Sequence, residues 1–173
     1  MPLDHPKEQL VHLGLGSNLK DPFLQLKQGL QAIEDSLPIR EFRCAGFYTS
    51  PPMGGMEQPD YLNTVCSFFT NLEPEALLKS LREIEDQQGR QRKEHWGART
   101  LDIDILLYGN EVSQSQTLTL PHPGVESRDF VLVPLLEISP ELIHPQTRLP
   151  LRDSLDALLK NSPLTLKTHH EGY

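Results

Sequence analysis

Two aspartates separated by one residue, Asp102 and Asp104, give the chain its strongest chemical signal. Residues i and i+2 of a strand face the same way, so the two carboxylates project together. Mg²⁺ binds through one or two carboxylates plus substrate phosphates, and a carboxylate pair can hold two ions. An isolated D-x-D pair is also typical of a solvated strand face. The basic residues that precede this pair favour the metal site.

The segment from Gly89 to Arg99 carries four basic residues against one acidic residue, in a chain of net charge −8. Arg90, Arg92 and Arg99 can each donate paired hydrogen bonds to phosphate. The segment therefore predicts a polyphosphate site beside the aspartates. Trp96, the only tryptophan, has polar neighbours. It is either a core anchor or a side chain that faces a ligand.

A second group of residues suits a flat heterocycle. Tyr61 and Asn63 share a strand face, which places an aromatic plane beside an amide. The alternative role for Tyr61 is cross-strand packing. His122 stands between two prolines and shortly before Arg128 and Phe130. It is either an exposed turn residue or a phosphate contact.

The elements that must position these residues follow from the spacing of apolar side chains and from turn signals. Asp21 is expected to cap the first helix, and Gly89 to follow the end of the second. Gly109 and Asn110 are expected to turn a hairpin. The expected helices are 22–37, 74–88, 130–138 and 151–160; the expected strands are 9–16, 39–50, 61–72, 101–108 and 118–120.

Two stretches deserve separate expectations. The strand at 39–50 should place Phe42, Cys44, Gly46 and Tyr48 on one face. The stretch at 51–60 contains three prolines and two glycines, so it cannot be regular structure. We interpret it as a functional loop, because binding residues concentrate on loops.

The order strand, helix, strand, strand, helix, strand resembles the split βαβ pattern of a ferredoxin-like α+β fold. That fold has an antiparallel sheet with helices on one face, and further C-terminal helices follow it here. A doubly wound parallel sheet is disfavoured, because strands and helices do not alternate regularly. We expect one domain over residues 1–160 and a flexible tail over 161–173.

Composition and motifs exclude several functions. The acidic net charge argues against a general nucleic-acid binder. No apolar run approaches the roughly 20 residues that span a membrane, and the polar N-terminus is not a secretory signal. Cys44 and Cys66 are expected to be reduced thiols of a cytosolic protein. Neither a P-loop, a GxGxxG motif nor a zinc-binding pattern is present.

Taken together, these residues identify a resemblance to the 6-hydroxymethyl-7,8-dihydropterin pyrophosphokinase family. The matches cover most of residues 10–145 in the family's order. The matching stretches are LGLGSNL (Leu13–Leu19), FYTSPPMG (Phe47–Gly54), QPDYLN (Gln58–Asn63), IEDQQGRQR (Ile84–Arg92), WGARTLDIDILLYG (Trp96–Gly109) and LPHPGVESRDFVLVPLLEISPEL (Leu120–Leu142).

The resemblance implies transfer of the ATP diphosphate to the pterin hydroxymethyl group, with release of AMP, in folate biosynthesis. It implies two Mg²⁺ ions held by Asp102 and Asp104, and catalytic roles for Arg90 and Arg99. The implied ATP-binding residues are Glu85, Arg92, Trp96, Ile105, His122 and Arg128. The implied pterin-binding residues are Ser50, Pro51, Met53, Tyr61, Asn63 and Phe130. The implied protein is a cytoplasmic monomer that binds neither nucleic acid nor membrane.

Two other readings stay open at this point. One is a metal-dependent glycosyltransferase or nucleotidyl enzyme that uses the D-x-D pair, although the chain is short for a sugar-nucleotide domain. The other is a ferredoxin-like module that binds nucleotide or metal without turnover. Such a module would carry the carboxylates and arginines without the pocket at Tyr61 and Asn63.

Overall fold

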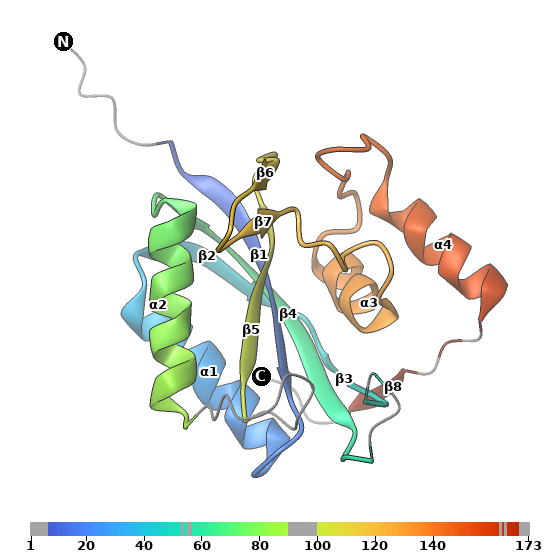
Figure 1. The fold of residues 1–173 in the computed structure, drawn as a ribbon, viewed down its shortest axis with the longest axis horizontal. Helices are drawn as coiled ribbons and strands as arrows, with labels where there is room; N and C mark the ends of the chain where they lie inside the picture. The colour runs from blue at the N-terminus through green and yellow to red at the C-terminus, as the bar shows by residue number, and fades with distance from the viewer. Residues whose placement is uncertain are drawn as a thin grey trace.

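A computed structural model of the protein describes residues 7–52, 54, 57–89, 100–162, 164 and 166–169 (Figure 1). The strands are β1 (Gln9–Ser17), β2 (Ile39–Cys44), β3 (Phe47–Ser50), β4 (Tyr61–Thr70), β5 (Asp102–Tyr108), β6 (Ser113–Gln114), β7 (Thr119–Leu120) and β8 (Lys167–His169). The helices are α1 (Pro22–Ser36), α2 (Pro74–Gln87), α3 (Asp129–Ile138) and α4 (Leu151–Asn161). Within these described ranges, each helix is too short or too polar to cross a bilayer.

The centre of the fold is a six-stranded sheet in the order β5-β1-β4-β3-β8, with β2 also paired to β4. Each ladder in it is antiparallel. β1 and β4 pair along their whole lengths, from Gln9 opposite Thr70 to Ser17 opposite Leu62. This arrangement confirms the predicted ferredoxin-like α+β class and leaves β5 as an edge strand.

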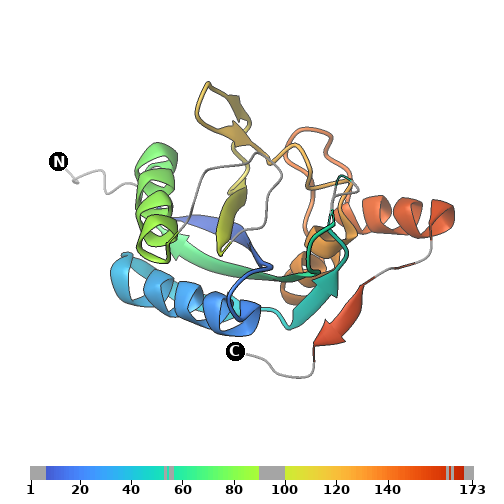
Figure 2. The same cartoon turned by 60° about the horizontal axis from the view of Figure 1, so that its bottom comes forward.

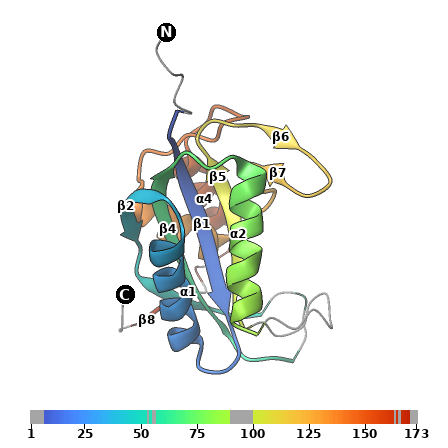
Figure 3. The ribbon, with the colours of Figure 1, turned by 90° about the vertical axis from the view of Figure 1, so that its left-hand side faces the viewer.

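Helices cover both faces of the sheet. α1 and α2 lie side by side on one face, as Figures 2 and 3 show. Their apolar residues, such as Leu26 and Leu81, pack with Leu13 and Ile103 of the sheet. α3 and α4, the additional C-terminal helices, form a second core on the opposite face. The expected one-sided arrangement therefore holds for α1 and α2 alone.

The helix ends follow the expected capping chemistry. The Asp21 carboxylate accepts the backbone N–H of Leu24 at 3.3 Å, and Pro22 occupies the first helical position. This pairing satisfies one of the donors that an N-terminus leaves open. After α2, Gly89 has a φ of +80°, which a residue with a side chain rarely adopts.

The expected strand at 39–50 is interrupted at residues 45 and 46, which separates β2 from β3. Phe42 and Cys44 pack on the core beneath α1 and α2, and Phe47 is the next residue buried there. Tyr48 instead donates its hydroxyl to Glu137 of α3 at 2.9 Å. The prediction that Tyr48 shares a face with Phe42 is therefore wrong, because the interruption shifts the alternation by one residue.

The expected hairpin at Gly109 and Asn110 is also wrong. The chain does turn there, but β5 pairs with β1, and the short hairpin forms between β6 and β7. Gly109 has a φ of +52° and donates its N–H to Leu10 of β1 at 2.8 Å. The turn thus ends the ladder with β1 and does not start a new one.

Three residues within the segment 161–173, which was expected to be a tail, are in a strand. Lys167–His169 form β8, which pairs with β3 at the edge of the sheet. The ring of His169 lies 5.4 Å from that of Phe23 in α1. Composition alone could not reveal this strand, because its partner β3 is far away in sequence.

The two cysteines are both free, as expected for reduced thiols. Cys66 is fully buried, and Cys44 faces it from the neighbouring strand. Burial raises the pKa of the Cys44 thiol to about 11. Since the thiolate is the reactive form, both residues behave as small core side chains.

Candidate active site

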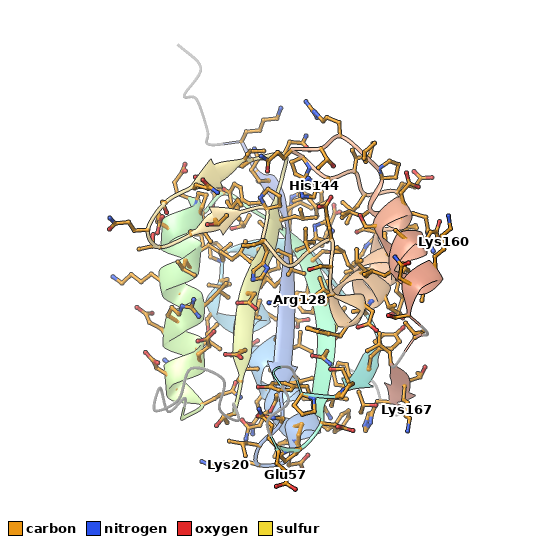
Figure 4. The ribbon with its side chains drawn as sticks, turned by 45° about the vertical axis from the view of Figure 1, so that its right-hand side comes forward. Lys20, Glu57, Arg128, His144, Lys160 and Lys167 are labelled. Carbon is orange, nitrogen blue, oxygen red and sulfur yellow. The ribbon has the colours of Figure 1, made fainter. Side chains whose placement is uncertain are left out.

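A cavity of about 180 Å³ lies between the open face of the sheet and the start of α3. Figure 4 shows Arg128 above the middle of the sheet, at this cavity. Strands that are distant in sequence line it. The lining residues are Gly14, Leu15, Gly16, Ser50, Pro51, Gln58, Tyr61, Asn63, Thr64, Val65, Asp102, Asp104, Leu106, Arg128, Phe130 and Val131.

One side of the cavity, the carboxylate wall, consists of Asp102 and Asp104 of β5. Their side chains alternate with the buried Ile103 and Ile105, so both carboxylates face the cavity. The Asp104 side chain is 46% exposed. This confirms the geometric prediction that the two residues share a strand face.

The opposite side, the amide wall, consists of Ser50, Pro51, Tyr61, Asn63 and Phe130. Asn63 is only 5% exposed. Its amide nitrogen donates to the Ser50 hydroxyl at 2.8 Å and to the Tyr48 carbonyl at 3.1 Å. These two bonds fix the orientation of the amide group, so it is preorganised for a ligand.

Glycines form the floor between the two walls. In β1, Gly16 lies opposite both Asp102 and Asn63, and Gly14 lies opposite Asp104. A Cβ at Gly16 would stand 3.4 Å from the Asn63 oxygen. Sequence reasoning identified the strand but missed this role. The signal was present, because glycine inside a strand often marks the close approach of a ligand.

Two residues of the segment before α3 lie at this site: Arg128 lines the cavity, and His122 lies beside Asp104 of the carboxylate wall without lining the cavity itself. The Nδ1 of His122 accepts the N–H of Gly124 at 2.9 Å, which leaves the proton of the neutral ring on Nε2. That nitrogen is 3.9 Å from the Asp104 carboxylate. Burial lowers the pKa of His122, and Asp104 opposes this effect. His122 is therefore suited to donate a hydrogen bond beside the carboxylate wall.

The loop at 51–60 is attached to the turn after β1. Asn18 is buried, and its amide donates to the side chain of Gln58 at 2.9 Å and to the carbonyl of Pro59 at 3.1 Å. Gln58 itself lines the cavity. Sequence reasoning missed both residues, since an asparagine in a turn gives no sign of a distant partner.

Two of the residues implied for the nucleotide lie away from the cavity. Glu85 is fully buried at the end of α2, and Ile105 is buried in the core beneath α1 and α2. Neither side chain lines the cavity. The geometry therefore brings together the two aspartates, His122, Arg128 and the described residues of the amide wall, and leaves these two apart.

Five predicted site residues lie outside the described residues: Met53, Arg90, Arg92, Trp96 and Arg99. The described residues on either side of this stretch are Gly89, which follows α2, and Thr100, which is buried two residues before β5.

The residues of the carboxylate wall fit a magnesium site. Among the described residues, no group of three or more His, Cys, Asp or Glu side chains could enclose a metal by itself. Two half-buried carboxylates beside an open cavity match the usual Mg²⁺ arrangement, in which substrate phosphates and water complete the shell. The donor set is all oxygen, as Mg²⁺ prefers.

Comparisons with known proteins place this chain in a family. The sequence model described as 7,8-dihydro-6-hydroxymethylpterin-pyrophosphokinase matches residues 12–140. The chain is 46% identical over 139 residues to a 2-amino-4-hydroxy-6-hydroxymethyldihydropteridine pyrophosphokinase of Haemophilus influenzae, covering 80% of this chain and 87% of that protein. An Aquifex aeolicus protein of the same name is 41% identical over 83% of this chain and 88% of its own length.

Longer proteins also contain the same unit. The folic acid synthesis protein of Schizosaccharomyces pombe is 40% identical over 88% of this chain, which spans 21% of that protein. A solved HPPK-DHPS structure with substrates shares the fold, with a TM-score of 0.69, 13% identity and coverage of 90% of this chain. Our chain spans 44% of that chain. The chain therefore belongs to the 7,8-dihydro-6-hydroxymethylpterin-pyrophosphokinase family.

Proposed function

We propose that the cavity transfers the β,γ-diphosphate of ATP to the hydroxymethyl group of 6-hydroxymethyl-7,8-dihydropterin, releasing AMP, as a step of folate synthesis. One observation carries the proposal: a single cavity places paired carboxylates opposite a preorganised amide with aromatic neighbours. The glycine floor of β1 separates the two walls by a single strand. A metal-bound polyphosphate and a flat heterocycle can therefore meet within one site.

The amide wall binds the pterin. Tyr61 and Phe130 offer aromatic faces to the ring, and Asn63 reads its edge. Ser50 holds the Asn63 amide, and Pro51 lines the same side of the pocket. The family resemblance adds Met53 to the proposed pterin-binding residues. Since Asn63 is already held by two hydrogen bonds, little ordering is needed when the pterin binds.

Asp102 and Asp104 of the carboxylate wall would hold two Mg²⁺ ions for the nucleotide. When bound, the ions supply neutralisation of phosphate charge and a lower pKa of the attacking hydroxyl. The Nε2–H of His122, 3.9 Å from the Asp104 carboxylate, is suited to donate to a phosphate oxygen, and Arg128 adds a positive charge to the cavity. The family resemblance adds Arg92 and Trp96 to the proposed nucleotide-binding residues.

The chemical step needs positioning and charge stabilisation more than a protein base. The hydroxyl oxygen forms a bond to the β-phosphorus of ATP, and the bond between that phosphorus and the α–β bridging oxygen breaks. AMP leaves with the electron pair of the broken bond, and the hydroxyl proton passes to water. Arg90 and Arg99 stabilise the charge that develops on the transferred phosphates and on AMP. The two walls hold the reactants in line, which makes the reaction effectively unimolecular.

The proposal is tested by incubating the protein with ATP, Mg²⁺ and the dihydropterin, followed by separation of the nucleotides. We expect AMP in an amount equal to the pterin consumed, and none when the pterin is omitted. ADP would indicate transfer of the γ-phosphoryl group alone, and no product would indicate a binding module. Either result would contradict the proposal. We further propose that the protein is a cytoplasmic monomer. Light scattering in solution would test the oligomeric state.

A further inference from the structure

A buried carboxylate holds the strand that carries the two aspartates. Glu85, in the last turn of α2, is fully buried. Its Oε1 accepts the backbone N–H of Ile103 at 2.9 Å. The guanidinium of Arg82, one turn earlier, donates to both oxygens of Glu85, at 3.0 and 3.2 Å. A helix of the opposite face is thereby bonded to the backbone between Asp102 and Asp104.

The bond from Ile103 to Glu85 takes the place of a hydrogen bond that a further strand would form with the open edge of β5. β5 is the edge of the sheet, and its neighbour β1 pairs with it on one side alone. An edge strand leaves alternate N–H and C=O groups without a ladder partner. Glu85 satisfies the outward N–H of Ile103, and further along the strand His122 donates its backbone N–H to the carbonyl of Leu106 at 2.9 Å. The outer edge is thus held on both sides of Asp104.

The energetics favour a positioning role over a purely stabilising one. Burying a carboxylate is unfavourable unless it is paired and hydrogen-bonded. A well-packed apolar side chain in the same place is often at least as stabilising as a buried ion pair. An apolar side chain could not accept the N–H of Ile103, however. The Glu85–Arg82 pair fixes the position and orientation of the backbone between the two aspartates.

The same geometry argues against direct contact between Glu85 and a nucleotide. The Glu85 side chain is fully buried and does not line the cavity. Both of its oxygens already accept hydrogen bonds from Arg82, and one of them also accepts Ile103. The bond to Ile103 gives Glu85 a route of influence on a ligand through β5.

We infer that Glu85 is a positioning residue for the metal site: it fixes the backbone at Ile103 and so sets the relative orientation of the Asp102 and Asp104 carboxylates, with Arg82 as its charge partner. This inference rests on the proposed function, since it assigns Mg²⁺ to those carboxylates. Partners of metal ligands commonly alter metal affinity about 10- to 100-fold when they are replaced.

The test measures binding of Mn²⁺, together with α,β-methylene-ATP, by the electron paramagnetic resonance of free Mn²⁺. Glu85→Leu removes the acceptor, and we expect Mn²⁺ affinity to fall about 10- to 100-fold. Glu85→Gln keeps an acceptor oxygen but loses the charge, so we expect a smaller loss of several-fold. Glu83→Gln, an exposed change in the same helix, is the matched control and should bind as the unchanged protein does.

A second readout separates positioning from general damage. Affinity for 6-hydroxymethylpterin, measured by fluorescence at saturating Mn²⁺ and nucleotide analogue, should stay within about twofold of the unchanged protein. Unaltered Mn²⁺ affinity in Glu85→Gln would overturn the inference, as would an equal loss of pterin and Mn²⁺ affinity. If Glu85→Leu does not fold, Glu85→Gln alone decides.

These measurements are made without turnover. If the unchanged protein binds Mn²⁺ but forms no AMP, the proposed reaction fails while the Glu85 comparison still stands. If it binds no Mn²⁺ at all, the inference is overturned.

Discussion

The two walls of the cavity differ in how far their polar groups are exposed to solvent. Asn63 lies on β4, in the interior of the sheet, and is 5% exposed with its amide fixed by two bonds. Asp104 lies on the edge strand β5, and its side chain is 46% exposed. The amide at the centre of the amide wall is buried and preorganised, whereas Asp104 of the carboxylate wall is half-exposed.

This difference matches what each ligand requires. A heterocycle is recognised by hydrogen bonds whose loss leaves buried groups unpaired, so the amide must be fixed and shielded in advance. Mg²⁺ keeps several waters and completes its shell with substrate phosphates, so its carboxylates must stay accessible. The openness of the carboxylate wall then makes support from outside the cavity necessary, and Glu85 and His122 supply it along the edge of β5.

Removing a carboxylate should have the largest effect on turnover. It should leave pterin binding at the amide wall unchanged. For Asp102→Ala and Asp104→Ala we expect turnover to fall at least about 100-fold, because charge stabilisation in the transition state is lost. Melting temperature and pterin affinity should remain near those of the unchanged protein. Asp156→Ala, an exposed change on α4, is the control for loss of a carboxylate. Near-normal turnover in either variant would remove the basis for the metal assignment.

Replacing Arg99 should come next in size. For Arg99→Ala we expect kcat to fall on the order of 100-fold, since a donor to the transferred phosphates is lost. Pterin affinity should change little, because the proposed role of Arg99 concerns the phosphates and not the pterin. Steady-state kinetics with each substrate varied in turn would measure this, with Arg152→Ala on the exposed face of α4 as control. An effect confined to pterin affinity would refute the phosphate role.

Damage to the amide wall should show the opposite pattern. Asn63→Ala leaves the Ser50 hydroxyl and the Tyr48 carbonyl without their donor, and removes the group that reads the pterin edge. Unpaired buried groups cost about 1–3 kcal/mol, so we expect the KM for pterin to rise about 10- to 100-fold with a smaller change in kcat. Asn71→Ala, an exposed change beyond the end of β4, should be silent. An unchanged KM would contradict the pterin assignment.

The smallest effect on activity concerns His12, which links β1 to α3 through the Ser139 hydroxyl at 2.9 Å. Burial lowers the pKa of His12 from 6.5 to about 4. Between pH 4 and 6.5, His12 therefore binds more protons in the unfolded chain than in the folded protein. Its contribution to the free energy of unfolding is fully present above pH 6.5 and is lost as the pH falls toward 4. The shift corresponds to a loss on the order of 3 kcal/mol.

Urea unfolding at several pH values would measure this loss. In His12→Leu the stability should vary less between pH 6.5 and 4, with turnover at pH 7.5 close to that of the unchanged protein. If the free energy of unfolding depends on pH in the same way in His12→Leu and in the unchanged protein, other groups govern the acid sensitivity. A large loss of turnover would show that the contact between β1 and α3 also shapes the cavity.

Local pattern was sufficient for much of the fold. Apolar periodicity predicted α1 and α2, and the order of strands and helices predicted the antiparallel sheet. The two-residue spacing predicted that Asp102 and Asp104 share a face. Pattern failed where a distant partner decides the structure. The interruption before β3 is stabilised by Glu137 of α3, which accepts the N–H of Gly46, and β8 exists because β3 offers it an edge.

The same limit applies to the site. Tyr61, Asn63 and Phe130 were identifiable by residue type and resemblance, and the structure places them around one cavity. The contact between Asn18 and Gln58 joins residues 40 positions apart, and that between Glu85 and Ile103 joins residues 18 apart. Neither contact has a local signature, because a buried polar side chain reveals its role only through the partner that satisfies it.

The most direct measurement follows the phosphates themselves. The protein is given ATP that carries one isotope label at the β-phosphorus and another at the γ-phosphorus, together with Mg²⁺ and 6-hydroxymethyl-7,8-dihydropterin. If the two walls act as one site for diphosphate transfer, both labels appear on the pterin in equal amounts and the released AMP carries neither. Transfer of the γ label alone, with the β label left in ADP, would contradict this.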